Sequence, residues 1–261
     1  MDAENGWRYD VAALLVSGSE RGSGRGVRQP RDPIRTKGDD VGENGAGLVF
    51  GMIQTPERPE DEADLNRWYD EEHLAEQLAC PGVLSARRFV AIAGEPKYLA
   101  TYDLESPAVL ESPEYRRIAE SPTAWTTHIH SYATIGKHNV YREITPASLE
   151  PKPGGPTGSG LFIQMLDVDP EHEDELNEWS NTEHLPDRLS LPGFLRARRF
   201  VATAGDPKYL VIYDLESPDA LSTPEYKEMQ GSPSERTKRM VAVAQNLVRM
   251  TYNDITPKLD S

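Results

Sequence analysis

Apolar positions along the chain change from strand spacing to helical spacing and back. An apolar run of strand length covers 47–54, and good helix formers cover 61–78, where Leu65, Trp68 and Glu72 stand at i, i+3 and i+7. Pro81-Gly82 ends this helical pattern. The elements expected after it are strands at 83–92 and 98–104, helical turns from Pro107 to Ala119 and a last strand at 131–141.

The same pattern occurs a second time, and parts of the text are identical. Residues 86–91 (Ala-Arg-Arg-Phe-Val-Ala) recur as 197–202, and residues 102–107 (Tyr-Asp-Leu-Glu-Ser-Pro) recur as 213–218. From Leu65 to Pro146 the offset between the two series stays at 111 residues. We interpret this repetition as a tandem duplication of an α+β unit of about 100 residues. The second series predicts a strand at 160–167, a helix at 173–189 and a last strand at 241–252.

Segments rich in Gly, Pro and Ser separate the repeated parts. Residues 1–46 contain too little apolar surface to offset the entropy of ordering, which predicts a disordered leader. Residues 151–160 are typical of a linker. The chain therefore divides into repeat 1 at 47–150 and repeat 2 at 161–261.

Each repeat has the order β-α-β-β-α-β, which is the ferredoxin-like split motif. Such a sheet carries its helices on one face and leaves the other face bare. We therefore expect an α+β fold in which two tandem ferredoxin-like units pack their sheets together and form an intramolecular α+β barrel.

Composition narrows the function classes. A net charge of −15 over 261 residues argues against a nucleic-acid partner, and the Arg pairs at 87–88 and 198–199 favour a solvated or ion-paired role. No apolar run approaches the roughly 20 residues of a membrane span. We expect a cytoplasmic protein that has no membrane partner, binds a small hydrophobic molecule, and forms a pseudo-dimer within one chain; further self-association stays open.

The two helical patterns share a Trp and a Glu-His-Leu sequence. His73 stands three residues before Glu76, and His184 stands three residues before Asp187. A carboxylate at that spacing raises the pKa of a histidine and suits it to proton transfer near neutral pH. A structural role is the alternative, in which the histidines lie on a solvated helix face.

Aromatic residues supply candidate binding groups. Trp68 and Trp179 either pack on the sheet as core or stack on a ligand. Tyr98 and Tyr102 share one face of their strand, as do Tyr209 and Tyr213. Phenols at these positions either orient a substrate oxygen or fill the layer between the sheets.

Other cofactor and metal signals are weak. His128, His130 and His138 occur only in the first repeat, and on a strand the first two would share a face, but no third ligand lies in register. The sequence contains no Gly-rich phosphate loop and no Cys-x-x-Cys motif. We expect no cofactor and no metal site.

The helix text around Trp179 and Glu183-His184-Leu185-Pro186, with Leu191-Pro192-Gly193-Phe194 and Ala197-Arg198-Arg199-Phe200, resembles the EthD-like branch of the dimeric α+β barrel superfamily. The first repeat follows the pattern with Glu72-His73-Leu74 but has Ala75 where Pro186 stands. The resemblance implies cofactor-free chemistry on aromatic or polyketide-like compounds, with a first-helix histidine as the acid-base group. Tandem fusions of two such units, like the one expected here, also occur among haem-binding relatives of this family.

The leading hypothesis is a cofactor-independent lyase or isomerase, dehydratase- or cyclase-like, that acts on a small hydrophobic carbonyl or phenolic metabolite. His73 or His184 is the expected general acid or base, tuned by Glu76 or Asp187. One alternative is a non-catalytic small-molecule-binding or assembly module. Another is a cofactor-free or haem-dependent oxygenase.

Overall fold

The computed structural model describes residues 45–149 and 158–258. The predicted leader lies almost entirely outside these residues, as does most of the predicted linker. No helix in the described ranges is long and apolar enough to cross a membrane.

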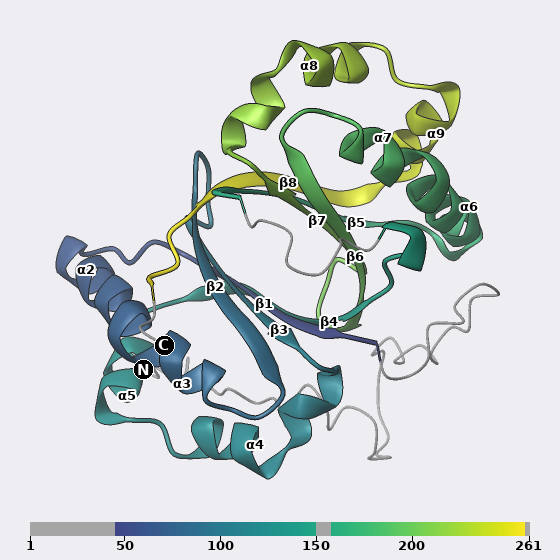
Figure 1. The fold of residues 1–261 in the computed structure, drawn as a ribbon. Coiled ribbons are helices and arrows are strands. Elements are labelled where there is room, and N and C mark those ends of the chain that lie inside the picture. Colours follow the sequence, from purple (N-terminus) through teal and green to yellow (C-terminus); the bar gives the residue numbers. More distant parts are fainter. Residues whose placement is uncertain (1–44, 150–157, 259–261) are drawn as a thin grey trace, which may run out of the picture.

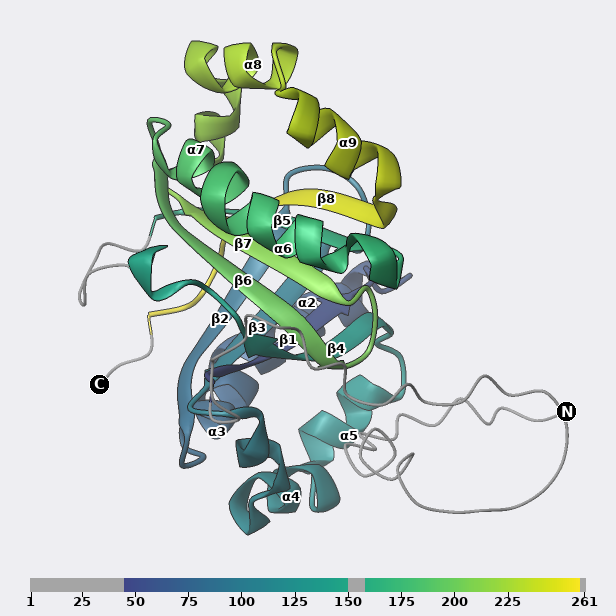
Figure 2. The same ribbon diagram turned by 90° about the vertical axis from the view of Figure 1, so that its right-hand side faces the viewer.

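Eight strands form one closed antiparallel barrel in the order β1-β3-β2-β8-β5-β7-β6-β4 (Figures 1 and 2). The strands are β1 (Gly47–Ile53), β2 (Val83–Ala91), β3 (Tyr98–Leu104), β4 (Ile135–Glu143), β5 (Gly160–Asp167), β6 (Phe194–Ala204), β7 (Tyr209–Leu215) and β8 (Gln245–Asp254).

The helices lie outside the barrel, those of the first half on one side and those of the second half on the opposite side (Figures 1 and 2). In the first half they are α2 (Pro59–Trp68), a π-helical turn (Tyr69–His73), α3 (Leu74–Leu78), α4 (Pro113–Glu120) and α5 (Ala124–His130). In the second half they are α6 (Glu173–Trp179), a π-helical turn (Ser180–His184), α7 (Leu185–Leu189), α8 (Pro224–Gly231) and α9 (Glu235–Val243). Short 3₁₀ turns at Pro107–Glu111 and Pro218–Ser222 precede α4 and α8.

The predicted fold class, two ferredoxin-like units with sheets packed together, is wrong. Strand β2 pairs with β8 through Phe89↔Asp254, and β4 pairs with β6 through Tyr141↔Ala202. These two pairings join the first half to the second by main-chain hydrogen bonds, so one sheet closes on itself. Unpaired edge strands are unfavourable, and closure removes them. The sequence prediction considered the bare faces of the sheets and not their edges.

The barrel interior is apolar along most of its length and charged near one end. Side chains such as Phe50, Phe89, Phe200 and Tyr252 fill it. In the charged part, Arg87 donates to Asp214 at 2.7 Å, and Arg198 of the second half pairs with Asp103 of the first. The adjacent residues Arg88 and Arg199 point the other way, because neighbouring strand residues face opposite sides. The expected ion-paired role therefore holds for Arg87 and Arg198.

The last helix and strand of each half depart from expectation. The segment predicted as a strand from Ser131 begins its strand at Ile135, and α5 lies before it. Likewise α9 continues to Val243, so β8 begins at Gln245 rather than at 241. Thr123 and Ser234 explain the helices, because the hydroxyl of each caps an N-terminus by accepting from the amide three residues later.

The long helix of each half contains a π-helical turn where the sequence predicts continuous α-helix. In the second half the Leu185 amide donates to the Ser180 carbonyl, an i to i+5 hydrogen bond that accommodates one extra residue. The same turn in the first half runs from Tyr69 to His73. In a regular α-helix, residues five apart point in widely different directions; a π turn brings them back to one side. Trp179 and His184 therefore stack, with ring centroids 4.4 Å apart.

Candidate active site

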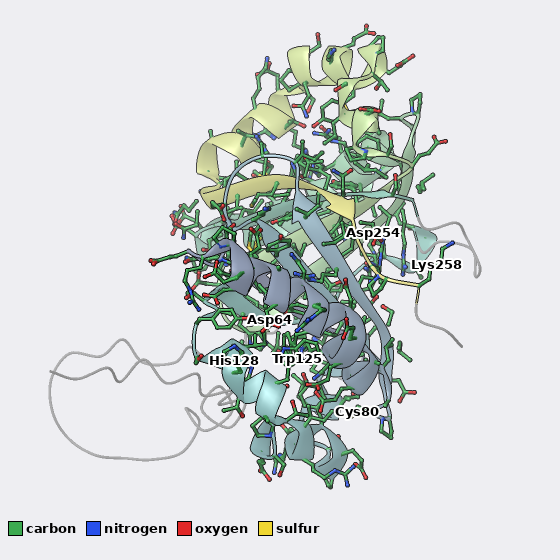
Figure 3. The ribbon with its side chains drawn as sticks, turned by 90° about the vertical axis from the view of Figure 1, so that its left-hand side faces the viewer. Asp64, Cys80, Trp125, His128, Asp254 and Lys258 are labelled. Carbon is green, nitrogen blue, oxygen red and sulfur yellow. The ribbon has the colours of Figure 1, made fainter. Side chains whose placement is uncertain are left out.

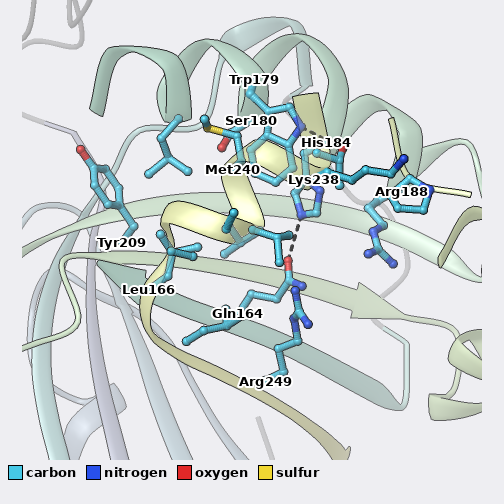
Figure 4. Close-up of a pocket in the computed structure, with 18 of the residues that line it drawn as sticks. Gln164, Leu166, Trp179, Ser180, His184, Arg188, Tyr209, Lys238, Met240 and Arg249 are labelled. Carbon is cyan, nitrogen blue, oxygen red and sulfur yellow. Dashed lines mark hydrogen bonds between the residues drawn. The ribbon is translucent and has the colours of Figure 1, made fainter. Parts of the chain in front are cut away.

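A cavity of about 400 Å³ lies in the second half, between the outer face of the barrel and helices α6, α7 and α9. Figure 4 shows Gln164 and Arg249 rising from the sheet and Trp179, His184 and Arg188 facing them from the helices. Val241 and Leu247 are exposed at its edge and give it an apolar rim. This volume suits a small organic ligand.

His184 is held neutral in this cavity. Its Nε2 lies 2.9 Å from Oε1 of Gln164, which only accepts, so Nε2 carries the proton and Nδ1 keeps its lone pair. Burial, together with the positive charges of Arg188, Arg199 and Arg249, lowers the His184 pKa to about 3. The expectation of a raised pKa is wrong, because no described ion pair joins His184 to Asp187 and desolvation dominates.

Three arginines line the cavity. Arg199 is buried and donates to Asn181 at 2.7 Å and Asn177 at 2.8 Å. Arg188 is buried with its guanidinium over the Tyr226 ring, 4.7 Å from the centroid, whereas Arg249 is exposed. Among the described lining residues there is no aspartate or glutamate. The cavity is therefore electropositive within an acidic chain.

The predicted aromatic residues of the second half separate into two groups. Trp179 and Tyr209 line the cavity, and Nε1 of Trp179 donates to Thr237 at 3.1 Å. Tyr213 is fully buried and stacks on Phe162, with ring centroids 5.8 Å apart. Asp187 is not among the lining residues; burial raises its pKa. The structure thus brings together His184, Trp179 and Tyr209, and leaves Tyr213 and Asp187 outside.

In the first half a side chain occupies part of the corresponding space. Tyr69 stands where the second half has Ser180, and its buried ring lies 4.2 Å from Cζ of Arg88. A cavity of about 90 Å³ lies beside His73. His73 stacks on Trp68 at 4.1 Å, and its Nδ1 lies 3.8 Å from Glu76.

The predicted functional residues of the first half have structural partners. Burial lowers the His73 pKa despite the opposing effect of Glu76, so the expectation of a raised value is wrong here too. Tyr98 donates to Glu62 at 2.7 Å. Tyr102 is buried beside His73, with ring centroids 6.0 Å apart, and Trp68 donates to Thr126 at 3.1 Å. The predicted side chains of the first half therefore contact other side chains of the protein.

The three histidines that occur only in the first repeat lie on two structural elements. His128 and His130 are on α5, a helix rather than a strand, and His138 is on β4. His128 is exposed between α5 and α2, where its Nε2 lies 3.8 Å from Asp64 (Figure 3). His130 points toward Trp68, with ring centroids 6.3 Å apart. Within the described ranges, no group of three His, Cys, Asp or Glu side chains is placed to hold a metal ion.

Sequence reasoning missed the polar half of the cavity: Gln164, Arg188, Arg199 and Arg249. A signal existed in the differences between the repeated texts. Arg188 stands where the first series has Gln77, and Arg249 where it has His138. Attention to shared residues selected the stacked Trp and His, and the histidines that differ between the repeats were considered only as metal ligands.

No family model matches the chain, and no curated protein matches it by sequence. Solved structures do match its fold. An anthrone oxidase-like protein is 15% identical, with a TM-score of 0.58 over 82% of this chain and 93% of that one. A protein of Fusobacterium nucleatum described as a monooxygenase is 9% identical, with a TM-score of 0.53 over 81% and 92%. A DypB variant of Rhodococcus jostii RHA1 in complex with heme is 12% identical, with a TM-score of 0.55 over 82% and 94%.

These similarities show that the fold is shared with those proteins. The dimeric α+β barrel superfamily and its EthD-like branch stay predictions from the sequence. Identities this low carry no residue roles from those proteins to this chain.

The described cavity does not fit haem. A haem between the helices and the sheet needs a flat slot and a ligand nitrogen facing it. Here Nε2 of His184, on the helix side, directly contacts Gln164 on the sheet at 2.9 Å, and the imidazole face is stacked on Trp179. The contact occupies the gap that a macrocycle would need.

Proposed function

We propose that the protein is a cofactor-independent oxygenase that oxidises a small, electron-rich aromatic compound in the second-half cavity. The observation that carries this proposal is the neutral His184, packed against Trp179 and Gln164 in a largely apolar cavity with no haem slot. Similar folds in proteins described as a monooxygenase and as anthrone oxidase-like add support. No comparison supports the lyase or isomerase hypothesis.

Such a reaction balances without another reductant. An activated methylene between aromatic rings and one dioxygen molecule give a carbonyl and one water. The substrate first loses a proton, and the resulting anion supplies the electrons to dioxygen. The arginines favour this anion, because positive charge in a cavity of low dielectric stabilises negative charge.

His184 has a specific part in this scheme. Its Nδ1 lone pair accepts the substrate proton, while Gln164 fixes the opposite nitrogen as N–H. An imidazolium alone is unfavourable beside three arginines. Proton transfer from the substrate to His184 creates the substrate anion beside the imidazolium. The transfer is favourable because these two opposite charges offset each other.

We further propose that the two halves arose by tandem duplication, with boundaries at 47–150 and 161–261. Support comes from the repeated text and from the π turns, which stand 111 residues apart at Tyr69–His73 and Ser180–His184. The EthD-like assignment rests on the sequence text from Trp179 to Phe200.

The test is dioxygen consumption with anthrone as the probe, corrected for autoxidation in buffer. We expect uptake by the purified, colourless protein and a loss of at least tenfold in His184→Gln. His128→Gln, an exposed histidine of the other half, is the matched control and keeps full activity. Uptake equal to the buffer rate, or unchanged in His184→Gln, refutes the proposal. A Soret band in the active protein assigns the activity to haem instead.

A further inference from the structure

The first half shows what kind of group the second-half cavity is shaped to hold. Tyr69 places a phenol ring on the face of Arg88, with Cζ 4.2 Å from the ring centroid. The same ring meets His73 edge to face, at 5.3 Å between centroids. In the second half Ser180 replaces this tyrosine, while the corresponding arginine and histidine, Arg199 and His184, remain. The missing phenol ring corresponds to the open cavity.

The second half also adds positive charge that the first half lacks. Arg188 stands at the position of Gln77, and Arg249 at that of His138. The barrel register places Arg249 opposite Gln164, just as His138 lies opposite Gly51. Several residues that differ between the halves, among them Ser180, Arg188 and Arg249, therefore line the cavity. Two of them introduce arginine, although the chain as a whole carries a net charge of −15.

We propose that the second-half cavity binds an aromatic anion, with its ring stacked on Arg199 and its acidic group against Arg188 and Arg249. The ring takes the place that Tyr69 fills in the first half, and guanidinium faces favour such stacking. The arginines supply charge-assisted hydrogen bonds to a carboxylate or phenolate. As an assignment of substrate class, this inference rests on the proposed oxygenase function; as an assignment of a binding site, it does not need turnover.

The first test is calorimetric titration with 1-naphthoate and with its neutral isostere 1-naphthamide. We expect naphthoate to bind at least tenfold more tightly, because a hydrogen bond to a charged group contributes about 1.5 to 3 kcal/mol, equivalent to roughly 10- to 150-fold. Equal or tighter binding of the amide overturns the inference, as does failure of both probes to bind.

Substitutions taken from the first half locate the site. Arg188→Gln and the exposed Arg249→His are each expected to weaken naphthoate by about tenfold and to leave the amide within twofold. Ser180→Tyr places a ring in the cavity and abolishes binding of both probes. Arg67→Gln, an exposed arginine on α2, is the control and changes neither. Unchanged naphthoate affinity in both arginine variants overturns the assignment, even if Ser180→Tyr fails to fold.

The outcomes also separate this inference from the proposed function. Naphthoate binding with the expected variant effects, but no dioxygen uptake with any probe, refutes the oxygenase proposal and leaves the anion site standing. Dioxygen uptake with anthrone, but no preference for naphthoate over the amide, refutes the anion site and leaves the oxygenase proposal standing.

Discussion

The neutral state of His184 predicts how the protein loses stability in acid. Burial and the neighbouring arginines lower its pKa to about 3, whereas an unfolded histidine titrates near 6.5. Between these values the unfolded chain binds a proton that the folded protein does not. Stability is therefore complete above about pH 6.5 and falls as the pH is lowered toward 3.

The magnitude follows from this difference in proton binding. At pH 5 nearly all unfolded chains are protonated at His184, and about 1% of folded molecules are. The resulting loss of unfolding free energy between pH 7 and pH 5 is about 2 kcal/mol from this residue alone. Other buried histidines add to the total, so the comparison must isolate His184.

His184→Gln isolates it, because glutamine retains a polar group near Gln164 and does not titrate. We expect urea unfolding to show that wild type loses about 2 kcal/mol more than His184→Gln between pH 7 and pH 5. Equal losses in the two proteins would mean that His184 is solvated or paired when folded. The account in which burial and neighbouring positive charge keep His184 neutral would then be wrong.

Two further predictions concern the scaffold. Tyr69→Ser should open a cavity in the first half and lower the free energy of unfolding by about 3 kcal/mol in urea titrations; a loss below about 1 kcal/mol would show that Tyr69 is not a core residue. Arg198→Met leaves Asp103 without its ion-pair partner and should cost about 3 kcal/mol, whereas Arg198→Met with Asp103→Leu should recover most of that loss. Equal destabilisation of the single and double variants would contradict a direct pairing across the barrel.

Local patterns predicted the elements better than their assembly. The order of strands and helices in each half matches the periodicity, and Pro81-Gly82 and Pro192-Gly193 follow the helix ends as predicted. Each glycine takes the third position of a tight turn, with φ of 87° and 78°. Closure through β2–β8 and β4–β6 was missed because pairings between distant strands leave no periodic signal within either strand. The segments before Ile135 and Gln245 were assigned to strands because short apolar runs do not distinguish a helix end from a strand.

Sequence patterns predicted some residues of the candidate site but not how these residues are arranged. Trp179 and His184 were found because the helix text repeats, but their stacking was not, since helical spacing assumes i+3 and i+4 neighbours. Arg199 was noticed only as one of a basic pair, and its direction depends on which side of the barrel wall it faces. The closure of the barrel decides which side Arg199 faces, and it places Arg199 and Arg198 on opposite sides of the barrel wall.

Because of the π turn, the site depends on the number of residues in the helix as well as on their types. Its i to i+5 hydrogen bond stores a single additional residue between Trp179 and Leu185. Removing one residue from that turn restores a regular helix and rotates everything on one side of it by about 100° relative to the other. The rings of His184 and Trp179 would then no longer stack, although the residues that line the cavity would still be present in the sequence. Among related chains, the number of residues between this tryptophan and histidine therefore decides whether the two rings stack, whereas the residue after the tryptophan, Tyr69 in one half and Ser180 in the other, decides how much space is left beside them.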